Sequence, residues 1–297
     1  MPDPLHVTRD DIVKGLKQLG VEPGALLMIH SSLSAIGHVE GGADTVVDAL
    51  LEVLGPEGTL VVPTFTYPAD YAESDDPAWI FDPVATPSAM GAITNAARWR
   101  PGARRSVHLW HSVAAIGPLA EMIASAGGDS AWDAESPMAW IMGHGGWLML
   151  LGTSYQSLTA IHIFEVEFGV DYRREYDVER RLRQADGSAV PLISHVHDRV
   201  DSHPGSDFNR FGTRMEAEDR VSIGHVGNAI SRLFRAGDAH EVACAMYAAD
   251  AKAFLKQGDS ITPNPYGRHH ANLKGNQCVV DPERAYPTPS PGRPHDD

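Results

Sequence analysis

The chain has 297 residues, 43% of them hydrophobic, and its 39 acidic side chains outnumber the 24 lysines and arginines, giving a formal net charge of −15. This length and composition fit a globular α/β protein, and the negative charge disfavours nucleic acid partners and favours cationic small molecules. Two cysteines, Cys244 and Cys278, lack any zinc-ribbon spacing, and no signal-like or membrane-length apolar segment is found, so we expect a cytoplasmic protein with no membrane partner.

Helix and strand signals alternate through the first half of the chain. Residues 8–20 predict an amphipathic helix that Thr8 caps and Gly20 ends. Further along, helices are predicted over 42–58 and 87–103, and strands over 25–33, 59–67, 106–117 and 146–154. Strand, helix and strand in this order form a βαβ unit. The sequence therefore predicts an α/β fold with a mostly parallel sheet that is covered on both faces.

The second half of the chain has a different character. Charged and apolar residues alternate around Asp186 and Gly187, which predicts a small antiparallel excursion near residues 172–215. A helix signal returns over 226–257. Residues 259–297 are rich in proline, histidine and asparagine, so we expect an extended or disordered tail after a single domain that spans residues 1–258.

Small polar residues follow the predicted strands, where an open parallel sheet binds its ligands. His30, Ser31 and Ser32 end the first strand, and the glycine pair 41–42 precedes a helix whose free N–H groups suit a phosphate. The adjacent arginines 104–105 suit phosphates too, although such pairs are commonly solvated. Neither a G-x-G-x-x-G segment nor a P-loop is present, which disfavours nicotinamide and nucleoside triphosphate cofactors.

The segment TAIHIFEVEF, residues 159–168, carries ionisable groups in apolar surroundings. At helical spacing His162 and Glu165 share a face, whereas Glu167 points elsewhere. Three interpretations stay open from the residues alone: a structural pair, a metal site, or a general base oriented by a carboxylate. A metal centre of this type needs a second such motif, which is not found before His195, and no nucleophile elbow is present. Direct transfer without a covalent enzyme intermediate is the simpler expectation.

Several segments together resemble one family, that of the aminoglycoside 3-N-acetyltransferases. They are HSSLSAIGHVEGGADTVVDALLEVLGPEGTLVVPTFTY, FDPVATPSAMGAI, RRSVHLWHSVAAIGP, ESPMAWIMGHGGWLMLLG, LTAIHIFEVEF and IGHVGNAISRLFRAGD, in the family's order between residues 8 and 257. The resemblance implies an αβα sandwich and transfer of an acetyl group from acetyl-CoA, a co-substrate, to the 3-amino group of an aminoglycoside. No resident metal is expected. The sequence leaves open whether the chain forms a homodimer.

The resemblance also assigns roles to residues. His162 is similar to the catalytic histidine of the family and Glu165 to its acidic partner, and we expect Thr159 or an N–H near Ser31 to stabilise the oxyanion. The positions expected to bind the cofactor are Ser31, Ser32, Leu33, Ser88, Met90, Gly91, Arg105, Ser106, His108 and Ser112. The positions expected to bind the acceptor are Tyr67, Asp70, Tyr155, Glu167 and Asp171.

The chain departs from the family pattern next to the expected chemistry. Before the catalytic histidine, Tyr155 and Leu158 replace a histidine and an asparagine, and Leu109 replaces a proline. These changes predict a narrower or shifted range of amino sugars. The alternatives are an N-acetyltransferase for another amine, such as an antibiotic-biosynthesis intermediate, and a coenzyme A binding protein without aminoglycoside activity. A metal-dependent hydrolase ranks third.

Overall fold

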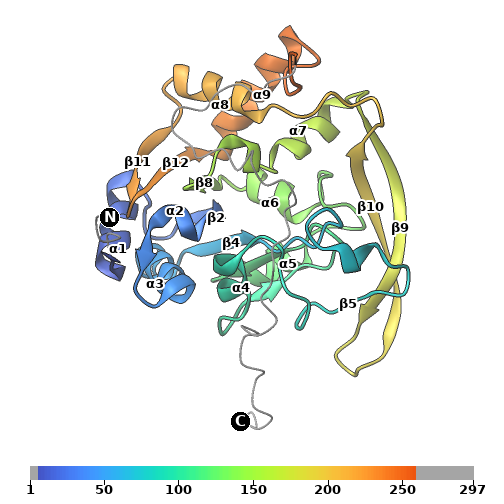
Figure 1. Ribbon diagram of the computed structural model, residues 1–297, viewed down its shortest axis with the longest axis horizontal. Helices are drawn as coiled ribbons and strands as arrows, with labels where there is room; N and C mark the ends of the chain where they lie inside the picture. The colour runs from blue at the N-terminus through green and yellow to red at the C-terminus, as the bar shows by residue number, and fades with distance from the viewer. Residues whose placement is uncertain (1–5, 259–297) are drawn as a thin grey trace, which may run out of the picture.

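A seven-stranded sheet forms the centre of the computed structural model, which describes residues 6–258 (Figure 1). The strands, in spatial order, are β11 (Ser222–Val226), β12 (Ala229–Arg235), β8 (Trp147–Leu151), β2 (Leu26–Ser31), β4 (Thr59–Pro63), β7 (Val113–Ile116) and β6 (Arg104–Arg105). The neighbouring strands β8, β2 and β4 are parallel, while β12 and β7 run against their neighbours. Because β11 and β6 are reversed once more, five of the seven strands point the same way. The predicted mostly parallel sheet is confirmed.

Helices cover both faces of this sheet. They are α1 (Arg9–Leu19), α2 (Leu33–Ile36), α3 (Gly42–Leu54), α4 (Ala92–Arg98), α5 (Ala120–Ser125), α6 (Pro137–Gly143), α7 (Ile161–Phe168), α8 (Phe208–Ala217) and α9 (Ala236–Ala249). Alternate residues of β2 enter different cores: Leu27 and Ile29 pack with residues of α1, α3 and α4, whereas Met28 packs with residues of α6, α7, α8 and α9. This period of two produces the αβα sandwich that the family resemblance implied.

The first helix shows how local signals set an element's limits. Thr8 accepts a hydrogen bond from the Asp11 N–H, and the Asp11 carboxylate accepts one from the Thr8 N–H. At the other end Gly20 has φ +103°, a left-handed conformation that costs glycine little. Both predicted ends of α1 are confirmed.

Residues 106–117 correct one prediction. They were expected to form a single strand, but only Val113–Ile116 is extended, and it forms a hairpin with β6. The intervening chain turns because the Nδ1 atom of His108 accepts hydrogen bonds from the N–H groups of Trp110 and His111.

Residues 226–257 correct a second prediction. The sequence predicts a helix throughout, but Ala229–Arg235 is β12, and the helix α9 begins at Ala236. Arg232 looks like the polar position of an amphipathic helix, yet its side chain is fully buried and forms an ion pair with Glu216 on α8, 2.7 Å away. This ion pair lets an arginine occupy a central strand.

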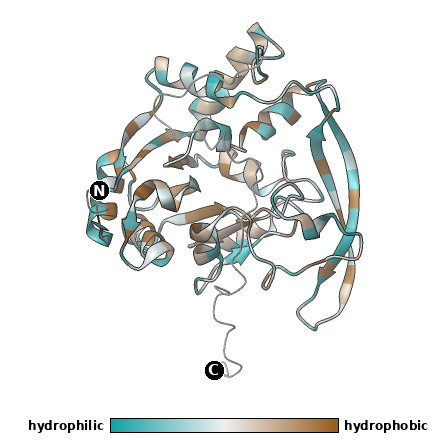
Figure 2. Cartoon of the chain, viewed as in Figure 1, coloured by the Kyte–Doolittle hydropathy of each residue, from teal (hydrophilic) through white to brown (hydrophobic). Residues whose placement is uncertain are grey.

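A smaller sheet lies at one side of the sandwich. Its order is β10 (Ala189–Arg199), β9 (Arg173–Arg183) and β5 (Ile80–Phe81), and β9 and β10 form a long antiparallel hairpin. Gly187, with φ +84°, lies in its turn, so the predicted excursion is confirmed. Most residues of the hairpin are hydrophilic (Figure 2). Its base passes close to α7, which brings side chains of both strands to the predicted site.

The remaining elements are short. They are the strand pair β1 (His6–Val7) and β3 (His38–Val39) and the 3-10 turns η1 (Ala72–Asp75) and η2 (Tyr155–Ser157). Between residues 6 and 258 no helix has both the length and the apolar character needed to cross a membrane. The predicted tail, residues 259–297, lies outside the described residues, and the single domain expected for 1–258 stays a prediction.

Candidate active site

The helix α7 positions the predicted catalytic pair at the carboxyl end of β8. The chain leaves β8 through Gly152, where an added Cβ would lie 2.6 Å from the Cβ of Ala35. It then forms η2 and enters α7, which ends at Gly169 with φ +60°. On this helix Nδ1 of His162 lies 2.6 Å from Oε2 of Glu165, so the two side chains are in contact as the spacing predicted.

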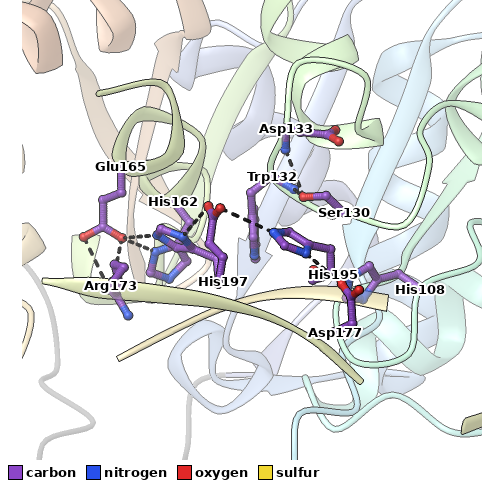
Figure 3. A network of polar contacts seen from close by, with 11 residues as sticks. His108, Ser130, Trp132, Asp133, His162, Glu165, Arg173, Asp177, His195 and His197 are labelled. Carbon is purple, nitrogen blue, oxygen red and sulfur yellow. Dashed lines mark hydrogen bonds and ion pairs between the residues drawn. The ribbon is translucent and has the colours of Figure 1, made fainter. Parts of the chain in front are cut away.

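Glu165 is the centre of a buried polar network (Figure 3). Its side chain has no exposed surface, and the Nε atom of Arg173, on β9, lies 3.0 Å from its Oε2. Nε2 of His197, on β10, lies 3.6 Å from the same oxygen. Burial alone would raise the pKa of Glu165, but His162, His197 and Arg173 outweigh it and hold this pKa well below its usual value. Glu165 is therefore a carboxylate at neutral pH.

His162 has the environment of a general base. Burial lowers the pKa of its ring more than the charge of Glu165 raises it, so the ring is neutral near pH 7. Because Nδ1 faces an ionised carboxylate, the proton resides there and Nε2 keeps its lone pair. Trp132 and Phe208 contact the ring, with centroids 5.2 and 5.5 Å away. These contacts fix the ring plane.

Two open cavities meet beside His162. One, of about 660 Å³, lies at the carboxyl ends of β2 and β4, and the other, of about 500 Å³, contains the His162 side chain in its wall. Asp70, Met90, Gln156 and Thr159 line both. The Thr159 hydroxyl is buried and has no hydrogen-bond partner among the described residues. A group transferred from one cavity to the other would therefore pass next to these four residues.

Nine of the predicted site residues line these cavities. Ser31, Ser32, Leu33 and Gly91 line the first, Tyr67 and His162 the second, and Asp70, Met90 and Thr159 both. Ser88 lies just behind the first cavity, where its hydroxyl accepts hydrogen bonds from Thr94 and from the Met90 N–H. Ser88 therefore supports the loop that Met90 and Gly91 form.

Arg105, Ser106, His108 and Ser112 lie outside the lining of both cavities. Arg105 is partly buried, and its Nε–H donates to the hydroxyls of Thr64 and Ser112 while its terminal nitrogens donate to the carbonyls of Thr64 and Thr86. Burial lowers the pKa of Arg105 to about 9, which leaves it charged at neutral pH. The geometry of the cavities thus gives no support to a cofactor role for these four residues. Arg105 and Ser112 instead tie the β6–β7 hairpin to Thr64, at the end of β4.

Tyr155 corrects the expectation about the acceptor. Its side chain is 1% exposed, packs near Phe211 and Phe234, and donates a hydrogen bond from its hydroxyl to Glu216 at 3.1 Å. Leu158 is likewise fully buried in the core. Tyr155 and Leu158, the two departures just before the catalytic histidine, line neither cavity, so their side chains give no contact to an acceptor there.

Only one of the three acidic residues expected to bind the acceptor lines the cavities. Asp70 lines both cavities, but Glu167 faces the other side of α7, where it pairs with His240, and the exposed Asp171 lines neither cavity. Asp198 on β10 lines the second cavity instead and accepts a hydrogen bond from the Tyr67 hydroxyl at 3.1 Å.

The sequence analysis missed residues that distant segments bring to the site. Arg173 and His197 reach Glu165 from the hairpin, and Trp132 and His111 complete the wall near His162. The one local signal for His197 is the HVHD segment, residues 195–198, which begins at His195, where the sequence first offers a second histidine motif. Nothing in the local pattern of 171–175 distinguishes Arg173 from the arginine that follows it.

Three groups at this site could together hold a metal ion. Donor atoms of His162, Glu165 and His197 lie within 4.8 Å of one another. The guanidinium of Arg173 already contacts the Glu165 carboxylate, however, and a divalent cation there would be repelled by it. This arrangement favours the use of Glu165 to orient His162.

A neutral histidine that is held by a buried carboxylate in the wall of a cavity is typical of an enzyme that removes a proton from an incoming nucleophile. A family model described as aminoglycoside 3-N-acetyltransferase matches residues 28–248. The chain belongs to this family, and the predicted acyltransferase class is confirmed.

Individual relatives agree with this assignment. The chain is 33% identical over 263 residues to aminoglycoside N(3)-acetyltransferase VII of Streptomyces paromomycinus, a match that covers 78% of this chain and 88% of that protein. It is 38% identical over 204 residues to aminoglycoside N(3)-acetyltransferase III of a Salmonella species, covering 64% and 71%. Among solved structures, AAC-VIa bound to sisomicin is 29% identical with a TM-score of 0.73, covering 84% of this chain and 99% of that one.

Proposed function

We propose that this protein acetylates an amino group of an aminoglycoside, the 3-amino group of its deoxystreptamine ring, with acetyl-CoA as the donor. The observation that carries the proposal is the contact between Glu165 and His162, which lines the second of two cavities that share a wall, in a chain of this family. A related structure contains sisomicin, and another, of AAC(3)-IVa at 27% identity, contains a gentamicin. These ligands support a cationic amino sugar as the acceptor.

The residues of this site suffice for a direct transfer. An aminoglycoside amine is an ammonium in solution and becomes a nucleophile only after it loses a proton. Nε2 of His162 takes this proton, and Glu165 stabilises the imidazolium that results. The amine attacks the thioester carbonyl carbon, and the nitrogen of the tetrahedral intermediate loses its second proton to solvent. The intermediate collapses with cleavage of the C–S bond, and the His162 imidazolium gives its proton to the departing coenzyme A sulfur. The products are an amide and coenzyme A.

The buried hydroxyl of Thr159 is suited to the oxyanion of this intermediate. It lies in the wall shared by both cavities and lacks a partner among the described residues, as does the Ser31 hydroxyl. A donor that is already oriented and shielded from water stabilises a developing negative charge more than an exposed one does. This placement supports Thr159 as the oxyanion donor.

The two cavities suit the two substrates. Ser31, Ser32 and Ser34 offer hydroxyls to the donor in the first cavity, next to Leu33 and Met90. In the second cavity Asp70 and Asp198 are anionic groups that an ammonium can approach, and the aromatic rings of Tyr67 and Trp132 offer faces for a sugar ring. The net charge of −15 favours encounter with a polycation.

The structure disfavours one of the two alternative functions and leaves the other as a second candidate. Loss of the acceptor site was the argument for a coenzyme A binding protein without activity, but Tyr155 and Leu158 lie in the core and alter no cavity wall. The intact pair of His162 and Glu165 favours an enzyme. Another amine as the acceptor remains a second candidate, since the second cavity also contains the cations Arg173, Arg199 and Lys256.

The experiment is an acetyl-CoA consumption assay over a panel of aminoglycosides and simple amines, with His162→Ala as the test variant. We expect turnover with aminoglycosides, and a fall of about 10² to 10⁴ in kcat for His162→Ala with unchanged coenzyme A affinity. His225→Ala, on an exposed strand position, is the matched control. Full activity in His162→Ala would refute the role of His162 as the general base. Turnover with simple amines alone would show that the acceptor is not an aminoglycoside.

A further inference from the structure

A second histidine-containing cluster lies on the opposite side of α7 from the catalytic pair. Glu167 on α7 faces His240 on α9, and both carboxylate oxygens lie 2.9 Å from Nε2 of that ring. Cys244, one helical turn after His240, places its sulfur 3.6 Å from the same nitrogen. The donor atoms of the three residues lie within 4.8 Å of one another. The mechanism proposed above uses none of them.

The spacing of these atoms matches a tetrahedral zinc site. With a zinc–nitrogen bond of about 2.1 Å and a zinc–sulfur bond of about 2.3 Å, the nitrogen and sulfur lie about 3.6 Å apart, as they do here. The carboxylate oxygen should lie about 3.4 Å from the nitrogen in such a site, about half an ångström farther than it does. The Glu167 side chain is 48% exposed and can rotate by that amount.

The charge around the cluster also suits a cation. Within residues 6–258 the ion-pair partner of Glu167 is His240, and no arginine or lysine contacts its carboxylate, in contrast to Glu165. The exposed fractions of His240 and Glu167, 43% and 48%, allow an ion to enter from solvent and leave room for a water in the fourth position. Nitrogen, sulfur and carboxylate donors together select zinc over magnesium or calcium, which prefer oxygen alone.

We propose that Glu167, His240 and Cys244 form a zinc-binding site that links α7 to α9. The helix α7 also carries His162 and Glu165, so the ion would hold the catalytic helix against its neighbour from the side away from the substrates. Glu167 and His240 lie in the wall of an apolar cavity of about 560 Å³ between α6, α7 and α9. Such an ion would restrict the movement of α7 relative to α9 beside this cavity. The proposal is independent of the acetyltransferase function.

Cobalt(II) titration of the full-length protein tests the site, because a thiolate bound to cobalt gives a near-ultraviolet charge-transfer band that carboxylates and imidazoles do not. We expect the band to saturate at one equivalent, to vanish when zinc is added, and to be absent in Cys244→Ser. Cys278→Ser is the matched control: it removes the other cysteine of the chain, which lies outside the described residues, and should keep the band.

Two further variants guard against a misfolded Cys244→Ser protein. His240→Ala and Glu167→Gln should each weaken zinc binding at least tenfold. Zinc at about one hundred times its Kd should raise the melting temperature of the unmodified protein by about 5 °C, and this rise should disappear in Cys244→Ser. The proposal is overturned if no charge-transfer band forms, if the band depends on Cys278, or if zinc binding survives Cys244→Ser, since the ion would then occupy His162, Glu165 and His197 instead.

Discussion

Two glutamates on α7, two residues apart, have opposite surroundings. Glu165 has no exposed surface and contacts His162, His197 and Arg173, whereas Glu167 is 48% exposed and contacts His240. Both belong to a cluster with a histidine at ion-pair distance. The difference teaches that a carboxylate beside a histidine acquires its role from burial and from the third partner. An arginine fixes Glu165 as an anion that orients a base, while a thiol beside His240 makes the other cluster suitable for a metal ion.

The largest contrast is expected in the rate. Glu165→Gln removes the charge that stabilises the His162 imidazolium, and we expect kcat to fall by about 10² to 10⁴. Glu167→Gln, the same chemical change on the exposed face, should leave kcat within about twofold of the unmodified enzyme. Steady-state assays of both variants measure this contrast, and equal losses would show that Glu165 has no special role.

Arg173 should have an intermediate effect. Arg173→Met leaves the buried Glu165 without its cation, so the pKa of Glu165 rises. The pKa of His162, which Arg173 also lowers, rises with it, so less of the ring is in the neutral form that acts as the base. We expect a loss of about tenfold to a hundredfold in kcat and of about 3 kcal/mol in the free energy of unfolding. Arg173→Lys should recover part of both, as measured by kinetics and urea denaturation. A Met variant with full activity and reduced stability would make Arg173 purely structural.

The pH dependence of kcat/KM separates two effects on the pKa of His162, that of burial and that of the Glu165 charge. Because burial lowers the pKa of His162 below its usual 6.5, the neutral form persists to lower pH, and kcat/KM should fall only below pH 6.5. Glu165 raises the pKa of His162, so Glu165→Gln should move this acid limb to still lower pH. Profiles of kcat/KM for both proteins test the sign. If the acid limb of the kcat/KM profile moved to higher pH in Glu165→Gln, Glu165 would not be the group that raises the pKa of His162.

The smallest effect on activity is expected at Tyr155. Because its hydroxyl bonds to Glu216 inside the core, Tyr155→Phe should lower the free energy of unfolding by about 1 kcal/mol and leave kcat/KM for every aminoglycoside unchanged. Leu158→Asn, which buries an amide in an apolar core, should cost about 3 kcal/mol. Thermal denaturation and a substrate panel measure both. A shifted substrate range would restore the idea that these positions define specificity.

Local patterns in the sequence determined a good part of this protein. The limits of α1 follow from Thr8 and Gly20, and the contact between His162 and Glu165 follows from their spacing on one helix, because both depend on hydrogen bonds and side-chain directions within a few residues. The polar residues after β2 line a cavity because parallel strands end at one edge of their sheet. Several family segments in order identified the fold and the family.

The tertiary structure alone decided which groups complete the site. Arg173 and His197 reach Glu165 because a hairpin folds back across α7, and no local spacing encodes that approach. Arg105 looked suited to a phosphate and Tyr155 to a sugar, yet each finds its hydrogen-bond partners inside the protein. Arg232 sits in a central strand because Glu216, on another element, neutralises it. A polar side chain's role depends on whether the fold offers it a buried partner or leaves it to a cavity, and that choice is made by segments far away in the chain.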